Sequence, residues 1–388
     1  MPYNFDKIAD RKGTNCVKYD GVPQVFGRED VLPLWIADSD FPVAPFISEA
    51  IRKRAEHPVY GYTFHGPDFP RVVKAWVGRR NGWEVKPEWI GFSPGVVAGF
   101  SLAIQALTET GDGILIQPPV YPPFAKMIRM NNRKVIDNPL KWNGSRFDID
   151  FDDFEAKIAQ AKAFLMCNPH NPTGRVFSRD ELQRLGDLCV KHNAYIISDE
   201  IHSDLILKPN RHIHIASLSG EIAKRTITFF APSKTFNVAG LTSSVTVIPD
   251  ESLRRRFNHR VELVDAAHGN IFGTVAMIAA YGQGDQWLDA FMEQMALNAR
   301  YVADYLHTRI PSVKAYIPES TFLLWLDFRS WGLGPEELCR TLVDAGLGLG
   351  SGKDFGEEGA GFMRINIATS PEVLEEAMRR LEKADQAR

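Results

Sequence analysis

Short apolar runs, separated by helix-like stretches, recur along the chain from about residue 90. The clearest runs are residues 113–117 (GILIQ), 163–167 (AFLMC), 194–198 (AYIIS), 226–230 (TITFF) and 243–248 (SSVTVI). Each run lacks the polar alternation of a strand with one solvent-exposed face, so we interpret them as strands buried on both faces. The pattern predicts an α/β fold with a mostly parallel central sheet covered by helices.

The clearest helix signal lies at the C-terminus. Ser370 and Pro371 are typical of an N-cap and a first helical turn, and the apolar residues behind them share one helical face: Val373, Leu374, Ala377, Met378 and Leu381. By contrast, the glycine-rich residues 347–361 are the most loop-like stretch. Their glycines do not match a Walker loop, which ends in Lys-Ser/Thr, so a nucleotide-binding interpretation is weak.

Size and composition narrow the function classes. With 388 residues, 24% of them charged and a net charge of −3, the chain is long enough for one large and one smaller domain and has no basic block for nucleic acid. No run of eighteen apolar residues occurs and the N-terminus is polar, so we expect no membrane span, no signal peptide and a cytoplasmic enzyme.

The cysteines predict neither a metal site nor disulfides. Cys16, Cys167, Cys189 and Cys339 are scattered without a CxxC pair. Cys167 stands between a strand-like run and a polar motif. A wall of a pocket is one interpretation of its position, and a packed strand-end residue is the favoured one.

Polar clusters follow three of the predicted strands. They are residues 168–175 (NPHNPTGR), 198–202 (SDEIH) and 232–237 (PSKTFN). Ligands of open α/β sheets bind beyond the carboxyl ends of strands, although turn chemistry alone is the competing explanation. Lys234, Asp199 and Asn171 supply an amine, a carboxylate and an amide donor. A pyridoxal 5'-phosphate (PLP) enzyme needs these groups for its aldehyde, its pyridine nitrogen and its phenolic oxygen.

These motifs resemble those of fold-type I PLP enzymes, the class I/II aminotransferase superfamily. The matches are the NPTG of residues 171–174, the strand-end Asp199 and the Ser233-Lys234 pair. WIADSDFP, YGYT, SPGVV, QPPVYPPF, CNPHNPTGRV, SDEIH, PSKTFNVAGL and RINIA are similar to segments of the MalY/PatB branch, which contains cystathionine β-lyases and related carbon-sulfur lyases. The resemblance implies an aspartate-aminotransferase-like fold, with a large PLP domain over residues 46–285 and a small domain over 286–388 joined by residues 1–45.

The resemblance also implies roles for single residues. Lys234 is expected to hold PLP as a Schiff base and Tyr121 to stack on its ring. Backbone amides at Gly95 and Val96, with Ser233, are expected to face the phosphate at a helix N-terminus. Tyr62 is expected to reach the phosphate of a second subunit's cofactor, which implies a homodimer; a core tyrosine is the alternative.

Two further residues are candidates near the substrate. Arg364 lies in an apolar, strand-like stretch where an unpaired guanidinium is costly, so we expect it to bind the substrate α-carboxylate, with a structural salt bridge as the alternative. His202 stands where some relatives carry a tyrosine that contacts the cofactor ring oxygen. Its alternatives are a hydrogen bond near the cofactor and a satisfied strand end.

Three positions depart from the family pattern. Ala231 replaces a common serine and Thr242 a common phosphate-binding arginine, so Ser233 and backbone amides carry more of the phosphate contact. Ser39 replaces a methionine of the relatives' ADMDF motif, so we expect a changed substrate entrance.

The function implied by the resemblance is β-elimination. We expect L-cystathionine or related S-substituted cysteines to be cleaved to a thiol, pyruvate and ammonia. An aminotransferase is the second choice, because both reactions begin with proton abstraction by Lys234. A third hypothesis is a regulator that binds the cofactor without turnover, and the presence of Lys234 disfavours it. The resemblance does not identify the thiol leaving group.

Overall fold

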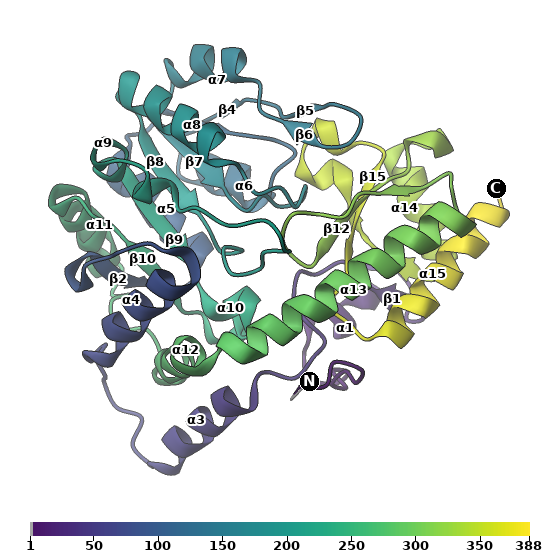
Figure 1. Cartoon of the computed structure of the whole chain (residues 1–388), viewed down its shortest axis with the longest axis horizontal. Coiled ribbons are helices and arrows are strands. Elements are labelled where there is room, and N and C mark those ends of the chain that lie inside the picture. Colours follow the sequence, from purple (N-terminus) through teal and green to yellow (C-terminus); the bar gives the residue numbers. More distant parts are fainter. Residues whose placement is uncertain (1–2) are drawn as a thin grey trace.

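The structure is a computed structural model that describes residues 3–388. Its larger sheet has seven strands in the order β2-β10-β9-β8-β7-β3-β4 (Figure 1). Their bounds are β2 Ile90–Ser93, β3 Gly113–Ile116, β4 Lys134–Asp137, β7 Ala163–Cys167, β8 Tyr195–Asp199, β9 Thr226–Phe230 and β10 Ser244–Val247.

This sheet is mostly parallel, as predicted. Neighbours from β9 to β4 pair in parallel, whereas β10 runs antiparallel to both β2 and β9. The five predicted strands occur within one residue of their expected ends, while β2 and β4 were not predicted. Residues 134–137 of β4, with the sequence KVID, are exposed or half-buried, so they lack the continuous apolar run that marks the central strands.

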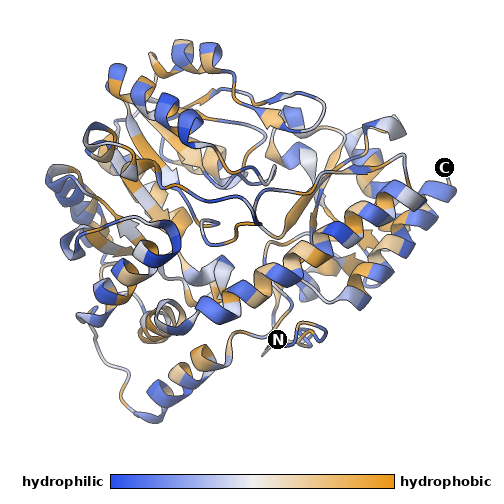
Figure 2. Ribbon diagram, in the orientation of Figure 1, coloured by the Kyte–Doolittle hydropathy of each residue, from blue (hydrophilic) through white to orange (hydrophobic). Residues whose placement is uncertain are grey.

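Helices cover both faces of the large sheet because successive strand residues point to opposite sides. Leu165 of β7 packs with α5, α6 and α11, whereas its neighbours Phe164 and Met166 pack with α7, α8 and α9. The bounds are α5 Val96–Leu107, α6 Pro123–Met130, α7 Phe151–Ile158, α8 Arg179–Lys191, α9 Gly220–Ala223 and α11 Glu251–Leu263. The helices α4 Asp68–Asn81 and α12 Ile271–Gln283 pack together beside β2 and β10. Figure 2 shows that apolar residues gather on the strands of the sheet, between the helices that cover it.

A second, antiparallel sheet has the order β11-β12-β15-β14. Its strands are β11 Lys314–Ala315, β12 Leu323–Asp327, β14 Gly350–Ser351 and β15 Phe362–Asn366. The long helix α13 Asp285–Arg309 runs from beside α12 to this second sheet (Figure 1), with α14 Pro335–Asp344 and α15 Pro371–Gln386. The predicted α15 is confirmed, because the Ser370 side chain accepts a hydrogen bond from the amide of Val373.

The N-terminal segment joins the second sheet region. It contains α1 Val17–Asp20, α2 Val22–Phe26 and β1 Leu32–Pro33, followed by α3 Pro45–Glu56. β1 pairs in parallel with β13 Leu347–Gly348. The remaining small elements are an antiparallel hairpin and a short helix. The hairpin consists of β5 Lys141–Trp142 and β6 Phe147–Asp148, and the helix is α10 Pro232–Thr235.

The loop expectation for residues 347–361 is wrong in part. The stretch contains β13, β14 and two short 3-10 helices, Gly352–Phe355 and Glu357–Gly359. A Cβ atom on Gly352 would lie 2.2 Å from the carbonyl oxygen of Gly359 and 2.4 Å from that of Phe362. The glycines therefore permit close backbone packing rather than a free loop. Among residues 3–388, no helix combines the length and the apolar character needed to cross a membrane.

Candidate active site

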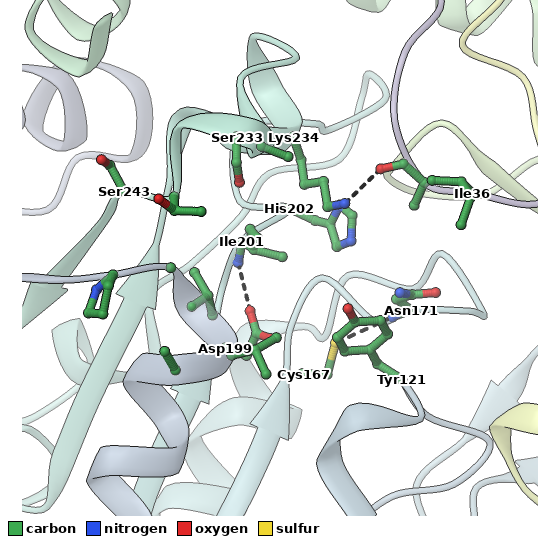
Figure 3. Close-up of a pocket in the computed structure, with 18 of the residues that line it drawn as sticks. Ile36, Tyr121, Cys167, Asn171, Asp199, Ile201, His202, Ser233, Lys234 and Ser243 are labelled. Carbon is green, nitrogen blue, oxygen red and sulfur yellow. Dashed lines mark hydrogen bonds between the residues drawn. The ribbon is translucent and has the colours of Figure 1, made fainter. Parts of the chain in front are cut away.

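A cavity of about 340 Å³ lies where the carboxyl ends of β7 and β8 meet the segment after β9. Nine of the ten predicted site residues line it, and Figure 3 shows several of them directed toward this common space. The lining residues are Ile36, Ala37, Pro94, Gly95, Val96, Val97, Ala98, Tyr121, Cys167, Asn171, Asp199, Ile201, His202, Ser233, Lys234, Ala239, Thr242, Ser243 and Arg364. Tyr62 does not line it: its side chain is fully exposed, which excludes the alternative of a core tyrosine.

Lys234 lies on the short helix α10, directly after β9. Its Nζ donates a hydrogen bond to the carbonyl oxygen of Ala37 at 2.7 Å (Figure 3). Burial lowers the pKa of Lys234 to about 8, and the charge of Arg364 acts in the same direction, whereas Asp38 and Asp199 oppose the shift. About half of this amine is therefore neutral at pH 8, and a nucleophile or general base requires the neutral form.

Asp199 is the last residue of β8 and is 3% exposed. Burial raises its pKa to about 7 and the charge of Glu200 adds to the rise, while the amide of Ile201 and the charge of Lys234 oppose it. Within residues 3–388 the carboxylate forms no ion pair; it accepts one hydrogen bond, from the Ile201 amide at 3.1 Å. A buried carboxylate at a cavity wall without a counter-charge suits a cationic ligand group such as a protonated pyridine nitrogen.

Asn171 and Tyr121 lie on the side of the cavity opposite Lys234 (Figure 3). The Oδ1 atom of Asn171 accepts a hydrogen bond from Arg364 at 3.0 Å, which directs its amide group. The sulfur of Cys167 accepts a hydrogen bond from the Asn171 backbone amide at 3.4 Å. Cys167 thus ends β7 and also lines the cavity, and burial raises the pKa of its thiol above the ordinary range, so it stays protonated.

Arg364 lies in the middle of β15 and is 7% exposed. Its Nη1 donates to Asn171, its Nη2 donates to the carbonyl oxygen of Trp35 at 2.8 Å, and its buried Nε has no partner. In the described part of the chain no carboxylate pairs with it, so the structural salt bridge considered from the sequence is absent. Burial lowers the pKa of Arg364 to about 10, which still leaves a cation at neutral pH. A buried cation without an anion indicates a carboxylate-binding site.

The N-terminus of α5 forms another wall. Gly95 precedes it with φ +94°, a conformation that favours glycine, and no side chain caps the helix. The free amides of its first turn, with the hydroxyl of Ser233 beside them in the lining, suit a phosphate. Thr242 also lines the cavity with φ +43°, a rare conformation for a β-branched residue, and backbone strain of this kind gathers at functional sites.

His202 faces the same cavity and is 2% exposed. Burial lowers its pKa to about 3, with the charges of Lys234 and Arg364 adding to the shift, so the ring is neutral. Its Nδ1 atom is buried without a hydrogen-bond partner. This ring nitrogen therefore does not satisfy the strand end.

The sequence interpretation missed the backbone of residues 36 and 37. Ile36 and Ala37 line the cavity, and the Nδ2 atom of Asn366 fixes this segment by donating to the carbonyl oxygens of Ile36 and Asp38 at 2.6 Å. Main-chain carbonyls carry no sequence signal, which is why the contact with Lys234 could not be predicted. Ser39 is not among the lining residues; it is buried, and its amide donates to Asn237.

Comparisons with known proteins identify the family. The family model "Aminotransferase class I and II" matches residues 29–381. The cystathionine beta-lyase PatB of Bacillus subtilis (strain 168) is 42% identical, over 98% of this chain and 99% of that protein. Protein MalY of Escherichia coli (strain K12) is 34% identical, over 97% of each chain. Cystalysin of Treponema denticola, whose crystal structure contains a pyridoxal 5'-phosphate cofactor, superposes with a TM-score of 0.97 at 34% identity and covers 100% of both chains.

Proposed function

Because the chain belongs to the aminotransferase class I and II family, we propose that it is a PLP-dependent carbon-sulfur β-lyase. It cleaves L-cystathionine or related S-substituted cysteines to a thiol, pyruvate and ammonia. The observation that carries the proposal is the 42% identity, over nearly the whole length, to a protein named cystathionine beta-lyase. The gathering of Lys234, Asp199 and Arg364 around one cavity supports it.

The residues present fit PLP by their chemistry. Lys234 offers an amine to the aldehyde and Asp199 a carboxylate to the pyridine nitrogen. The start of α5 at Val96, with Ser233 beside it, offers a place for the phosphate, whereas the Gly95 amide already donates to the carbonyl oxygen of Ser93 at 2.8 Å. When bound, PLP supplies a carbonyl that takes up the substrate amine and a ring that spreads the negative charge left by removal of the α-proton.

The side chains divide the remaining work. Arg364 binds the substrate α-carboxylate through its guanidinium, which Asn171 and the carbonyl oxygen of Trp35 hold in place. Lys234 removes the α-proton, because its lowered pKa of about 8 makes it a base near neutral pH. Asn171 holds Arg364 in place, and its amide would donate to the cofactor's phenolic oxygen. His202 lines the same cavity. Tyr121 stacks on the ring.

The overall reaction balances with one water. The carbon-sulfur bond at the β-carbon breaks, the sulfur leaves with the bonding electrons and takes a proton, and water converts the remaining three carbons and the amine to pyruvate and ammonia.

The test is product analysis of the purified holoenzyme with L-cystathionine. We expect equal amounts of thiol and pyruvate without any added keto acid. An aminotransferase would instead require a keto-acid acceptor and release no thiol, and that outcome would overturn the lyase proposal while keeping the family assignment.

A cytoplasmic homodimer also belongs to the proposal, with Tyr62 reaching the phosphate of a second subunit's cofactor. Its support is the exposure of Tyr60, Tyr62 and Phe64, at 57%, 101% and 81% in the single chain. Sedimentation equilibrium should give twice the mass of the chain, and Tyr62→Phe should weaken PLP binding without dissociating the dimer.

We also propose that the chain divides into two domains. A large domain over residues 46–285 would hold the seven-stranded sheet, and a small domain over 286–388 would include residues 1–45. The pairing of β1 with β13 supports the second assignment.

A further inference from the structure

A closed cluster of titratable side chains lies behind Asp199 and has no part in the proposed reaction. Glu200 follows Asp199 directly, and His212 and His214 come from the segment twelve and fourteen residues farther along. Glu200 is 0%, His212 5% and His214 1% exposed. Ser198 contacts Glu200 and neither residue lines the cavity, so the cluster is on the side of β8 away from the ligand.

Hydrogen bonds converge on the Glu200 carboxylate. Its Oε1 accepts from the hydroxyl of Ser198 at 2.7 Å. Its Oε2 contacts the Nε2 of His212 at 2.7 Å and the Nδ1 of His214. Burial opposes ionisation, yet the two histidines lower the pKa of Glu200 to about 2. The carboxylate is therefore ionised across the working range of an enzyme.

These contacts are those of a hydrogen-bonded cluster rather than of a metal site. The ligand atoms of Glu200, His212 and His214 lie within 4.8 Å of one another, close enough to be considered for a metal ion. Ligands about 2.0–2.2 Å from a tetrahedral zinc would lie about 3.3 Å apart. The separation of 2.7 Å between His212 and Glu200 is a hydrogen-bond distance instead.

The Glu200 charge is not cancelled by a lysine or an arginine. Within residues 3–388 its ion-pair partners are the two histidines alone. Burial lowers the pKa of His212, and the hydrogen bond and charge of Glu200 oppose this shift. The Glu200 carboxylate directly follows Asp199 in the chain, and its charge raises the pKa of Asp199.

We propose that Glu200 is a positioning residue for the reaction, which acts through Asp199. Held ionised by His212 and His214, it adds a second buried negative charge behind the Asp199 carboxylate. The two charges together hold the proton on the pyridine nitrogen of the cofactor. The inference rests on the proposed function, because it assumes that Asp199 faces that nitrogen.

Other charged groups face the two carboxylates and act on the same equilibrium. Asp204 influences His212 and is itself buried, with hydrogen bonds from Trp76 and Thr235. Seven further titratable or charged side chains interact electrostatically with Asp199, with Asp204 or with residues that line the cavity beside Asp199. They are Lys234, Tyr121, Cys167, Arg364, His202, Tyr281 and Arg80. Variants of Glu200 leave all of them in place.

The experiment measures the protonation of the pyridine nitrogen directly. The holoenzyme is reconstituted with PLP labelled with nitrogen-15 in the ring, and the nitrogen resonance is followed against pH. We expect Glu200→Gln, which keeps the shape of the side chain, to lose the ring proton at a pH lower than wild type by on the order of one unit. Its kcat should fall about tenfold with KM changed less than about twofold.

Two variants separate charge from shape. Glu200→Asp keeps the charge and should restore the wild-type titration. Ser198→Ala removes one hydrogen bond but keeps the charge, so it should change the melting temperature without moving the nitrogen titration. Should Glu200→Gln fail to hold cofactor, Glu200→Met provides a second uncharged side chain with a weak acceptor.

Three results would overturn the inference: a wild-type nitrogen titration in the uncharged variants, an equal shift in Ser198→Ala, or a stoichiometric metal in the purified holoenzyme. Failure of the proposed function would look different. Asp199→Asn would then leave the nitrogen titration unchanged, or the wild-type protein would not bind PLP at all.

Discussion

Two regions of the chain bury charges in opposite ways. In the N-terminal segment, the ammonium of Lys18 and the carboxylate of Asp40 are both fully buried and lie 2.8 Å apart, and Arg11 adds a contact to Asp40 at 3.0 Å. In the cavity, Asp199 and Arg364 are buried with no oppositely charged partner among the described residues. The ion pairs hold the N-terminal segment in place, whereas the unpaired charges at the cavity wall can pair with charged groups of a ligand.

The largest effect should come from the lysine of the cavity. Lys234→Ala removes the amine that binds the cofactor aldehyde and takes the α-proton, so turnover should fall below detection. The absorbance of lysine-bound PLP should vanish with it. Lys18→Ala is the matched control, because it removes a buried lysine that is already paired; its folded fraction should keep this absorbance. A Lys234 variant with both turnover and the absorbance would contradict the assignment.

Removing the Asp199 carboxylate should reduce turnover nearly as much as removing the Lys234 amine. Asp199→Ala should still bind PLP through Lys234 and the phosphate site, but kcat should fall by about a thousandfold, because nothing then holds the proton on the ring nitrogen. Steady-state kinetics and equilibrium dialysis of PLP measure the two quantities separately. Near-normal kcat would show that another group protonates the ring.

The unpaired arginine should affect substrate binding rather than folding. Arg364→Met should raise KM about a hundredfold, since the charge-assisted bonds to the substrate carboxylate are lost. Its free energy of unfolding should fall by less than about 1 kcal/mol or rise, because a buried cation without an anion is removed. Urea unfolding without substrate checks the second statement, and an unchanged KM would refute the carboxylate role.

The residues that line the cavity could be predicted from the sequence more completely than the contacts that surround them. Nine of ten proposed residues line one cavity. Asn171, Asp199 and Lys234 could be found because polar residues follow apolar strands. Most of the others came from the resemblance to a known family. The Ala37 carbonyl beside Lys234 was not predictable, since any residue supplies a carbonyl. The Glu200 cluster was missed for another reason. His212 and His214 lie in a segment without an element of its own, and only the tertiary fold brings them to β8.

The paired charges of the N-terminal segment should show the reverse behaviour of Arg364. Lys18→Met leaves the buried Asp40 with Arg11 as its remaining cation, so the free energy of unfolding should fall by about 2–3 kcal/mol. Arg28→Met, which breaks the exposed pair with Asp30, should cost less than about 1 kcal/mol. Equal losses in the two variants would show that burial does not distinguish these ion pairs.

The smallest effect concerns the pH dependence of cofactor attachment. The lowered pKa of Lys234, about 8 against an ordinary 10.5, means that the apoenzyme amine is mostly protonated below pH 8 and mostly neutral above it. The rate at which added PLP becomes lysine-bound should therefore rise about tenfold per pH unit below that midpoint and level off above it. Stopped-flow absorbance of the apoenzyme measures this rate. Arg364→Met removes one of the causes of the low pKa, so its midpoint should move to higher pH. A midpoint shared by both proteins would mean that burial alone sets the pKa, and that the unpaired guanidinium serves the substrate and not the lysine.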